Sequence, residues 1–92
     1  MSFKINVMKK VHILRRGQLN KTTNRFEFHD IEPFSSFAKA LKEVNKAYEI
    51  NKGTGFEQEL LHNGEWIFTY DCLSTDGKEI RVRDLIITKE VR

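Results

Sequence analysis

One stripe of apolar residues at helical spacing constrains this chain more than any other feature. The stripe consists of Phe37, Leu41, Val44 and Tyr48, with Ala40 and Ala47 beside them. Intervals of four, three and four residues line one side of an α-helix. A single helix of this length is marginal in water, so the stripe must pack on a sheet. Once buried, each of its four large side chains would contribute roughly 1.5–3 kcal/mol.

Both ends of this helix have sequence signals. Pro33 lacks an amide hydrogen, and we expect it to end the preceding strand. Ser35 or Ser36 then offers a hydroxyl that can cap the first turn. At the other end, the run Asn51-Lys52-Gly53 predicts the stop.

Alternating apolar residues predict two strands before the helix. The first covers residues 3–13, with Phe3, Ile5, Val7, Val11 and Ile13 on one face and a bend near Lys9-Lys10. A polar loop over residues 17–24 leads to a second strand, with Phe26 and Phe28 on one face. Met8 is a second candidate translation start, which would make residues 1–7 an N-terminal extension.

Three more strands are predicted after the helix, over residues 56–62, 65–73 and 78–88. Asn63-Gly64 and Asp76-Gly77 between them favour tight primed turns. A two-residue loop at Asp76-Gly77 sets the register of the last two strands. It places Phe68 opposite Leu85, Tyr70 opposite Arg83 and Cys72 opposite Arg81.

The predicted fold is therefore α+β, with one helix packed on a mostly antiparallel five-stranded sheet in the order β-β-α-β-β-β. This order is also that of a β-grasp fold, and order alone does not fix which strands are neighbours. At 92 residues, the chain has room for one core, so we expect a single domain over residues 1–92. No motif ties the chain to a family.

Composition limits the cellular location that we expect for this protein. Hydrophobic residues make up 39% of it, but no apolar run approaches the ~20 residues that cross a bilayer. Cys72 is the one cysteine and cannot form an internal disulfide. We expect a cytoplasmic protein, without membrane contact, whose stability comes from packing.

Charge is distributed unevenly along the chain. Residues 1–25 contain seven basic and no acidic side chains, whereas residues 26–92 contain nine basic and thirteen acidic ones, for a net charge of +3. One interpretation is a cationic ridge on the first hairpin, centred on Lys9-Lys10 and Arg15-Arg16, that contacts phosphates or an acidic protein. The other is local neutralisation by Glu27, Asp30, Glu57 and Glu59.

A second candidate surface combines aromatic and guanidinium groups. If Trp66, Phe68 and Tyr70 share a face with Arg81 and Arg83, that face could stack nucleic-acid bases. The alternative is that these aromatics form the core against the helix stripe. Both faces of the last three strands carry apolar residues, and one helix covers only one face. We therefore expect some exposed apolar surface, which favours a protein partner or a homodimer.

The sequence contains no recognisable catalytic set. His12, His29 and His62 are widely spaced, with no ligand spacing typical of a metal site. No phosphate-binding glycine motif occurs, and adjacent Asp71 and Cys72 would point to opposite faces of a strand. We expect no enzymatic activity, metal or cofactor.

The leading hypothesis is a small non-enzymatic protein-interaction module that binds an acidic partner through the basic hairpin and sheet surface. Its size also suggests a phage or mobile-element origin. The alternatives are nucleic-acid binding through the same basic residues, and a structural subunit that self-associates through an open sheet edge. The candidate binding residues are Lys9, Lys10, Arg15, Arg16, Lys21, Arg25, Trp66, Tyr70, Arg81 and Arg83.

Overall fold

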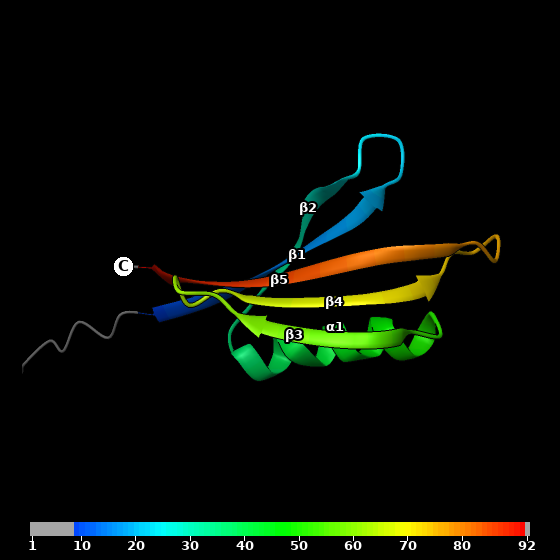
Figure 1. Ribbon diagram of the computed structural model, residues 1–92. Coiled ribbons are helices and arrows are strands. Elements are labelled where there is room, and N and C mark those ends of the chain that lie inside the picture. Colours follow the sequence, from blue (N-terminus) through cyan, green and yellow to red (C-terminus); the bar gives the residue numbers. More distant parts are fainter. Residues whose placement is uncertain (1–8, 92) are drawn as a thin grey trace, which may run out of the picture.

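The fold is one helix on a five-stranded antiparallel sheet (Figure 1). The computed structural model describes residues 9–91. Along the chain the elements are β1 (Lys9–Asn20), β2 (Arg25–Phe34), α1 (Phe37–Ile50), β3 (Thr54–Leu60), β4 (Trp66–Leu73) and β5 (Glu79–Val91). Across the sheet the strand order is β2-β1-β5-β4-β3. The predicted α+β architecture and element order are confirmed.

The first and last strands of the described part of the chain, β1 and β5, are neighbours in this sheet. β1 pairs with β5 antiparallel, with a continuous register from Lys9 opposite Val91 to Gln18 opposite Val82. A β-grasp sheet would have these two strands parallel, so the fold is a different arrangement. The bend expected at Lys9-Lys10 does not occur in this pairing. The predicted strand residues before Lys9 lie outside the described part of the chain.

The core lies between α1 and one face of the sheet. Ala40 and Val44 of α1 are fully buried, and Phe37, Leu41 and Tyr48 pack around them. This confirms the predicted helix stripe. The sheet contributes alternate residues of its three central strands, namely Leu14, Phe68, Tyr70, Cys72, Val82 and Ile86. Within residues 9–91, no helix is both long enough and apolar enough to cross a membrane.

Capping residues mark both termini of α1. Of the two serines proposed as caps, Ser36 is the one at the N-cap position, where its Oγ accepts a hydrogen bond from the Lys39 backbone N–H at 3.2 Å. At the C-terminus the backbone and side-chain amides of Asn51 both donate to the Ala47 carbonyl oxygen. Lys52 then takes a left-handed conformation with φ of 53°, which ends the helix as predicted.

Both hairpins after the helix have three-residue loops, not the predicted two-residue turns. The Leu61 N–H donates to the Glu65 carbonyl, and the Ser74 N–H donates to the Lys78 carbonyl. In each loop only the glycine, Gly64 or Gly77, has a positive φ, which is the pattern of a type I turn followed by a bulge.

The extra loop residue shifts the predicted register by one position. Phe68 lies opposite Asp84, Tyr70 opposite Val82 and Cys72 opposite Ile80. Since side chains alternate between faces, a shift of one residue moves every side chain of β5 to the other face relative to β4. The predicted pairing of these strands was therefore wrong.

The first hairpin is longer than predicted at both ends. β1 continues through residues expected in the loop, and the connecting turn is limited to residues 21–24, where Asn24 has a φ of 58°. β2 continues through Pro33 to Phe34, instead of ending before the proline. An edge strand accommodates proline because one side of its backbone needs no hydrogen bonds. The pairing of β1 with β2 shifts near Ile31, which forms a bulge.

Candidate interaction surface

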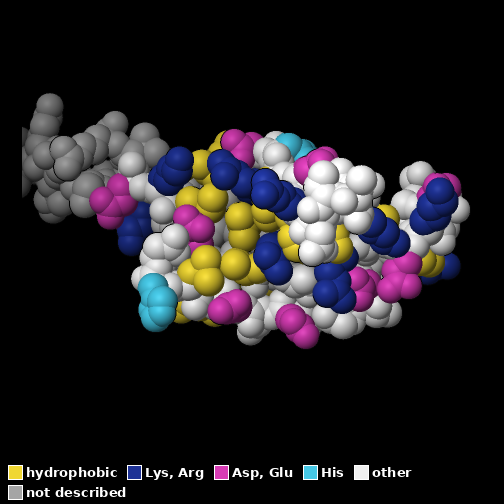
Figure 2. Space-filling model, turned by 45° about the horizontal axis from the view of Figure 1, so that its top comes forward, with side chains coloured by type: hydrophobic (Ala, Val, Ile, Leu, Met, Phe, Trp, Pro, Cys, Tyr) yellow, Lys and Arg dark blue, Asp and Glu magenta, His cyan; other side chains and the backbone are white. Residues whose placement is uncertain are grey.

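The sheet face opposite α1 is not covered by any element among residues 9–91, and we call it the open face. β1 and β5 place Ile13, Leu85 and Ile87 on it, and β4 adds Ile67. Each of these four side chains is only partly buried. Figure 2 shows hydrophobic side chains gathered on this side of the molecule, with Lys and Arg side chains among and beside them. The exposed apolar surface expected from the sequence is therefore present here.

Aromatic rings of β2 extend the open face toward the first hairpin. The guanidinium of Arg83 lies 4.3 Å from the centroid of the Phe26 ring, a cation–π contact. The ring of Phe28 lies over Gly17, where an added Cβ would come within 2.5 Å of the ring. Phe28 remains 39% exposed. Glycine at position 17 thus lets an aromatic side chain cover the backbone of β1.

The basic hairpin is partly neutralised by carboxylates of the same chain. Arg15 binds Asp30 across the β1–β2 pair, with Nε 2.8 Å from Oδ1. The side chains of Arg15 and Asp30 are 40% and 63% exposed, so water screens this pair and it adds little to stability. It nevertheless reduces the positive charge that Arg15 offers to a partner. Local neutralisation, the second interpretation of the sequence, holds for this residue.

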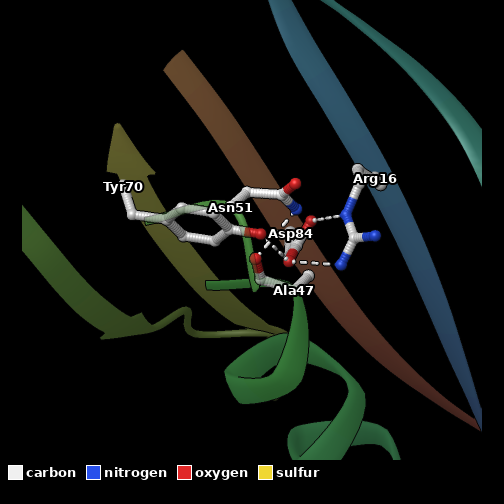
Figure 3. Close-up of polar contacts among 5 residues, drawn as sticks. All are labelled: Arg16, Ala47, Asn51, Tyr70 and Asp84. Atoms are coloured by element: carbon white, nitrogen blue, oxygen red, sulfur yellow. Dashed lines mark hydrogen bonds and ion pairs between the residues drawn. The ribbon is translucent and has the colours of Figure 1, made fainter. Parts of the chain in front are cut away.

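Arg16 points to the opposite face, into a buried polar cluster with Tyr70 and Asp84 (Figure 3). Its Nε and one terminal nitrogen donate to the two oxygens of Asp84 at 2.7 and 3.0 Å. The Tyr70 hydroxyl donates to the same carboxylate at 2.8 Å. The Asp84 side chain is 0% exposed and that of Arg16 is 27% exposed. Arg16 therefore ties β1 to β5 inside the fold.

This cluster perturbs the protonation of its neighbours. Burial and the Asp84 carboxylate raise the pKa of the Tyr70 hydroxyl well above its ordinary value of about 10. Partial burial disfavours the charged form of Arg16, but its hydrogen bond to Asp84 and the charge of that carboxylate raise its pKa overall. Burial also raises the pKa of the Cys72 thiol. All three groups are held in their ordinary protonation states at neutral pH.

The proposed aromatic–arginine face does not exist as one surface. Trp66 and Tyr70 lie on the helix side, where Trp66 packs on Phe68 with ring centroids 6.1 Å apart. Arg81 and Arg83 lie on the open face. The predicted register had placed all of them together, and the three-residue loop separates them. The alternative interpretation, in which Trp66, Phe68 and Tyr70 form the core, is correct for these aromatic residues.

Arg81 is bound to a carboxylate on the open face. Its guanidinium donates to Asp71 of the neighbouring strand, with Nε 3.0 Å from Oδ1. Arg83 donates to the Thr69 hydroxyl at 3.3 Å, in addition to its contact with Phe26. The predicted basic residues thus divide into those engaged within the chain and those on the hairpin that extend into solvent.

The solvent-exposed basic residues are Lys10 on β1, Lys21 in the turn and Arg25 at the start of β2. None of these three takes part in an ion pair among the described side chains. The side chain of Lys9 lies outside the described part of the chain. Two of these three, Lys21 and Arg25, stand at the tip of the first hairpin. The accessible positive charge of the hairpin is therefore greatest at its tip.

A cavity of about 220 Å³ lies beside Arg16, beyond the C-terminal end of α1. Ile80 and Val82 contribute apolar walls, and Gln18, His29 and Asn51 contribute polar ones. The cavity is below the roughly 300–1,000 Å³ of typical small-molecule sites. Its one cationic group, Arg16, is already bound to Asp84. This cavity does not have the features of an anion-binding site.

The histidines lie in separate places. His12 on β1 contacts the Thr88 hydroxyl at 2.8 Å, His29 lies on β2, and His62 lies in the loop after β3. Between residues 9 and 91, no three His, Cys, Asp or Glu side chains come together as a metal site.

The chain was compared with family models, curated proteins and solved structures. No match was found in any of them. Its function must therefore be inferred from its own surfaces.

Two features of these surfaces were not anticipated from the sequence. Asp84 was not singled out, although it stands between Val82 and Ile86 at core-facing positions, which was a signal for a buried carboxylate. The apolar positions of the open face were visible as residues, but their common face depended on the register of β4 and β5. Neither feature could be placed without the strand pairing.

Proposed function

We propose that this chain is a small non-enzymatic protein-interaction module that binds a partner through its open face and basic hairpin. The observation that carries the proposal is the open face itself, where Ile13, Ile67, Leu85 and Ile87 are uncovered by any described element. Apolar surface gathered on one side of a small protein is typical of an interaction site. Arginine and aromatic residues, as in the Arg83–Phe26 pair, are frequent energetic centres of such sites.

The charge of the hairpin favours an acidic partner. Lys21 and Arg25 stand at the tip and are exposed. Arg25 is adjacent to Phe26 on β2, so its side chain leaves the strand on the face opposite to the Phe26 ring. Basic groups at the rim of an apolar site mainly accelerate association with an oppositely charged surface. The partner therefore presents apolar side chains to the open face and carboxylates to the hairpin tip.

Nucleic-acid binding is the main alternative, and the structure reduces the residues that support it. Trp66 and Tyr70 pack in the core, and Arg15, Arg16 and Arg81 are each bound to a carboxylate. A stacking surface would have to use Phe26 and Phe28. Self-association through the same open face is the third alternative.

The test compares two charge-reversed variants with equal net charge. Lys21→Glu/Arg25→Glu alters the hairpin tip, and Lys42→Glu/Lys46→Glu alters exposed positions of α1. Proteins captured by the immobilised wild-type chain from its native host are then purified, and their affinities for all three chains are measured. We expect roughly tenfold weaker binding for the hairpin variant, a loss that shrinks at high salt, and little change for the helix variant.

Labelled single-stranded and double-stranded DNA and RNA are titrated in parallel at two salt concentrations. Micromolar affinity that falls steeply with salt and is lost in Lys21→Glu/Arg25→Glu would replace this proposal with the nucleic-acid alternative. Equal affinity of both variants for the purified partner would contradict the role of the hairpin.

A further inference from the structure

The two edges of the sheet differ in how accessible their backbones are. β2 forms one edge and is interrupted by the bulge at Ile31 and by Pro33, which has no N–H to donate. β3 forms the other edge, and all its residues except Phe56 are exposed. Its pairing with β4 is regular from Glu57 to Leu60. β3 is therefore the edge on which another strand can be added.

The hairpin geometry identifies the backbone groups on this free edge. The Leu61 N–H donates to the Glu65 carbonyl, so Leu61 directs its backbone toward β4. Alternate residues of an antiparallel strand direct their N–H and C=O to opposite sides. Glu59 and Glu57 accordingly face β4, whereas Gln58 and Leu60 direct both backbone groups outward. Four hydrogen bonds are available to a strand that pairs here.

The side chains of β3 define what such a strand must carry. Glu57 and Glu59 lie on the open face, opposite Thr69 and Ile67 of β4. Residues 53–77 contain five acidic and no Lys or Arg side chains. The nearby Arg81 is already bound to Asp71. An added strand would therefore lie beside two glutamates, and basic residues at alternate positions of that strand would form favourable cross-strand pairs with them.

The other face of the added strand would meet apolar surface. Leu60 is 55% exposed on the helix side of β3. Tyr48 of α1 packs against Phe56 of β3, with ring centroids 5.2 Å apart, and Leu41 lies two turns earlier on the same side of the helix. A shallow groove beside Leu41 is lined by Ala38 and Asn45 and by three charged side chains, Lys42, Lys46 and Glu49, so it is not an apolar groove. The apolar contact that the β3 edge itself offers on this side is therefore Leu60, where Figure 1 shows α1 running along the sheet.

We propose that β3 binds an extended segment of a partner protein in which basic residues alternate with apolar ones. The segment pairs with the backbone of Gln58 and Leu60, sets its basic side chains beside Glu57 and Glu59, and directs its apolar side chains toward Leu60. This mode of recognition is β-strand addition.

A second copy of this chain is a poor occupant of the edge. Its own free strand, β3, repeats the same two glutamates. Its other edge strand, β2, carries Glu27, Asp30 and Glu32 against one arginine, besides the bulge and proline described above. Like charges on adjacent strands are destabilising. The charge of the edge therefore selects a basic segment and opposes pairing between copies.

The test uses a capped hexapeptide of alternating lysine and valine, titrated into the ¹⁵N-labelled full chain. We expect saturable shifts of β3 amides and slower hydrogen exchange at the Gln58 and Leu60 amides. The same peptide with glutamate in place of lysine should bind at least about tenfold more weakly, because it places like charges beside Glu57 and Glu59.

Two variants of the protein test whether the peptide binds at the β3 edge. Gln58→Pro removes an outward N–H, which an edge strand tolerates, and should weaken binding about tenfold while the circular dichroism spectrum is unchanged. Glu57→Gln/Glu59→Gln keeps the backbone and should weaken binding about threefold to tenfold. Lys21→Glu/Arg25→Glu should bind the peptide like the wild type, which separates this site from the surface proposed above.

Three outcomes would overturn the proposal. The first is peptide-induced shifts confined to β1, β2 and β5, without shifts in β3, and the second is equal binding of the lysine and glutamate peptides. The third is a dimer of the free chain in sedimentation that Gln58→Pro abolishes, which would identify a second copy as the occupant.

Discussion

At the scale of single residues, Asp84 determines how the core is held together. It is a fully buried carboxylate on the central strand β5, and it accepts hydrogen bonds from Arg16 of β1 and Tyr70 of β4. A buried charge is tolerated only when it is paired and hydrogen-bonded. No buried side-chain polar atom among the described residues lacks a partner. The cluster thus links β1, β4 and β5 through hydrogen bonds inside the core.

Removing the charge of Asp84 should destabilise the fold strongly. Asp84→Asn leaves the partly buried Arg16 without its counter-ion, and we expect the free energy of unfolding in urea to fall by about 3 kcal/mol. The double substitution Arg16→Met/Asp84→Asn should lose less than the sum of the single substitutions, because no unpaired charge remains. A loss below about 1 kcal/mol for Asp84→Asn would show that the pair is not a structural requirement.

Tyr70 should make stability depend on alkaline pH. Its pKa is raised in the folded state by burial and by Asp84, so the unfolded chain releases this proton first, near pH 10. The stabilisation is therefore complete below pH 10 and is lost as the pH rises from there toward the folded-state pKa, with a slope of up to about 1.4 kcal/mol per pH unit.

The control for this pH dependence is a pair of phenylalanine variants. Tyr70→Phe should abolish that slope in urea unfolding between pH 9 and 11, while costing about 1 kcal/mol at neutral pH through the lost hydrogen bond. Tyr48→Phe leaves Tyr70 and Asp84 in place and should retain it. An unchanged slope in Tyr70→Phe would contradict the assignment.

At the scale of elements, local chemistry sets where each one begins and ends. The helix starts at Phe37 because Ser36 caps it, and it stops where Asn51 and Lys52 redirect the backbone. In the loops, the Asn63 side chain accepts from the Glu65 N–H at 3.1 Å, and Ser74 accepts from the Lys78 N–H at 3.2 Å. These side-chain bonds favour three-residue loops, and the loops in turn set the strand register.

The two serines before α1 provide a matched test of the cap. Ser36→Ala removes the acceptor for the Lys39 N–H and should lower the free energy of unfolding by about 1 kcal/mol. Ser35 accepts only from the exposed Lys39 ammonium, so Ser35→Ala should change stability by less than about 0.5 kcal/mol. Urea denaturation of both variants measures the difference, and equal losses would argue against Ser36 as the cap.

At the scale of the whole molecule, one helix on five strands leaves two kinds of surface available. The open face presents apolar and aromatic side chains close to the basic hairpin tip, and β3 presents a regular edge rich in acidic residues. The strand order separates them, because β2 and β3 are at opposite edges of the sheet. Under the two proposals, the molecule would contact an acidic partner surface and a basic segment at opposite edges of the sheet.

More of the fold than of the candidate sites could be predicted from the sequence. The helix stripe, its caps and the five strands follow from period and composition, which act over a few neighbouring residues. The binding residues depend on pairs distant along the chain. Arg16 and Asp84 are 68 residues apart, and nothing near Arg16 in the sequence distinguishes it from the exposed Arg25. Six of the ten predicted binding residues are engaged within the fold, namely Arg15, Arg16, Trp66, Tyr70, Arg81 and Arg83.

The sequence by itself determined the kind and order of the elements, the approximate ends of α1 and the concentration of positive charge in the first 25 residues. Only the tertiary structure decided which side chains face α1, which arginines are neutralised and which strand is left as an open edge. The physical reason is that one additional loop residue moves every side chain of a strand to the other face. The length of each loop depends on hydrogen bonds within the loop and on packing between strands. The packing involves residues distant along the chain, so no local sequence pattern predicts it.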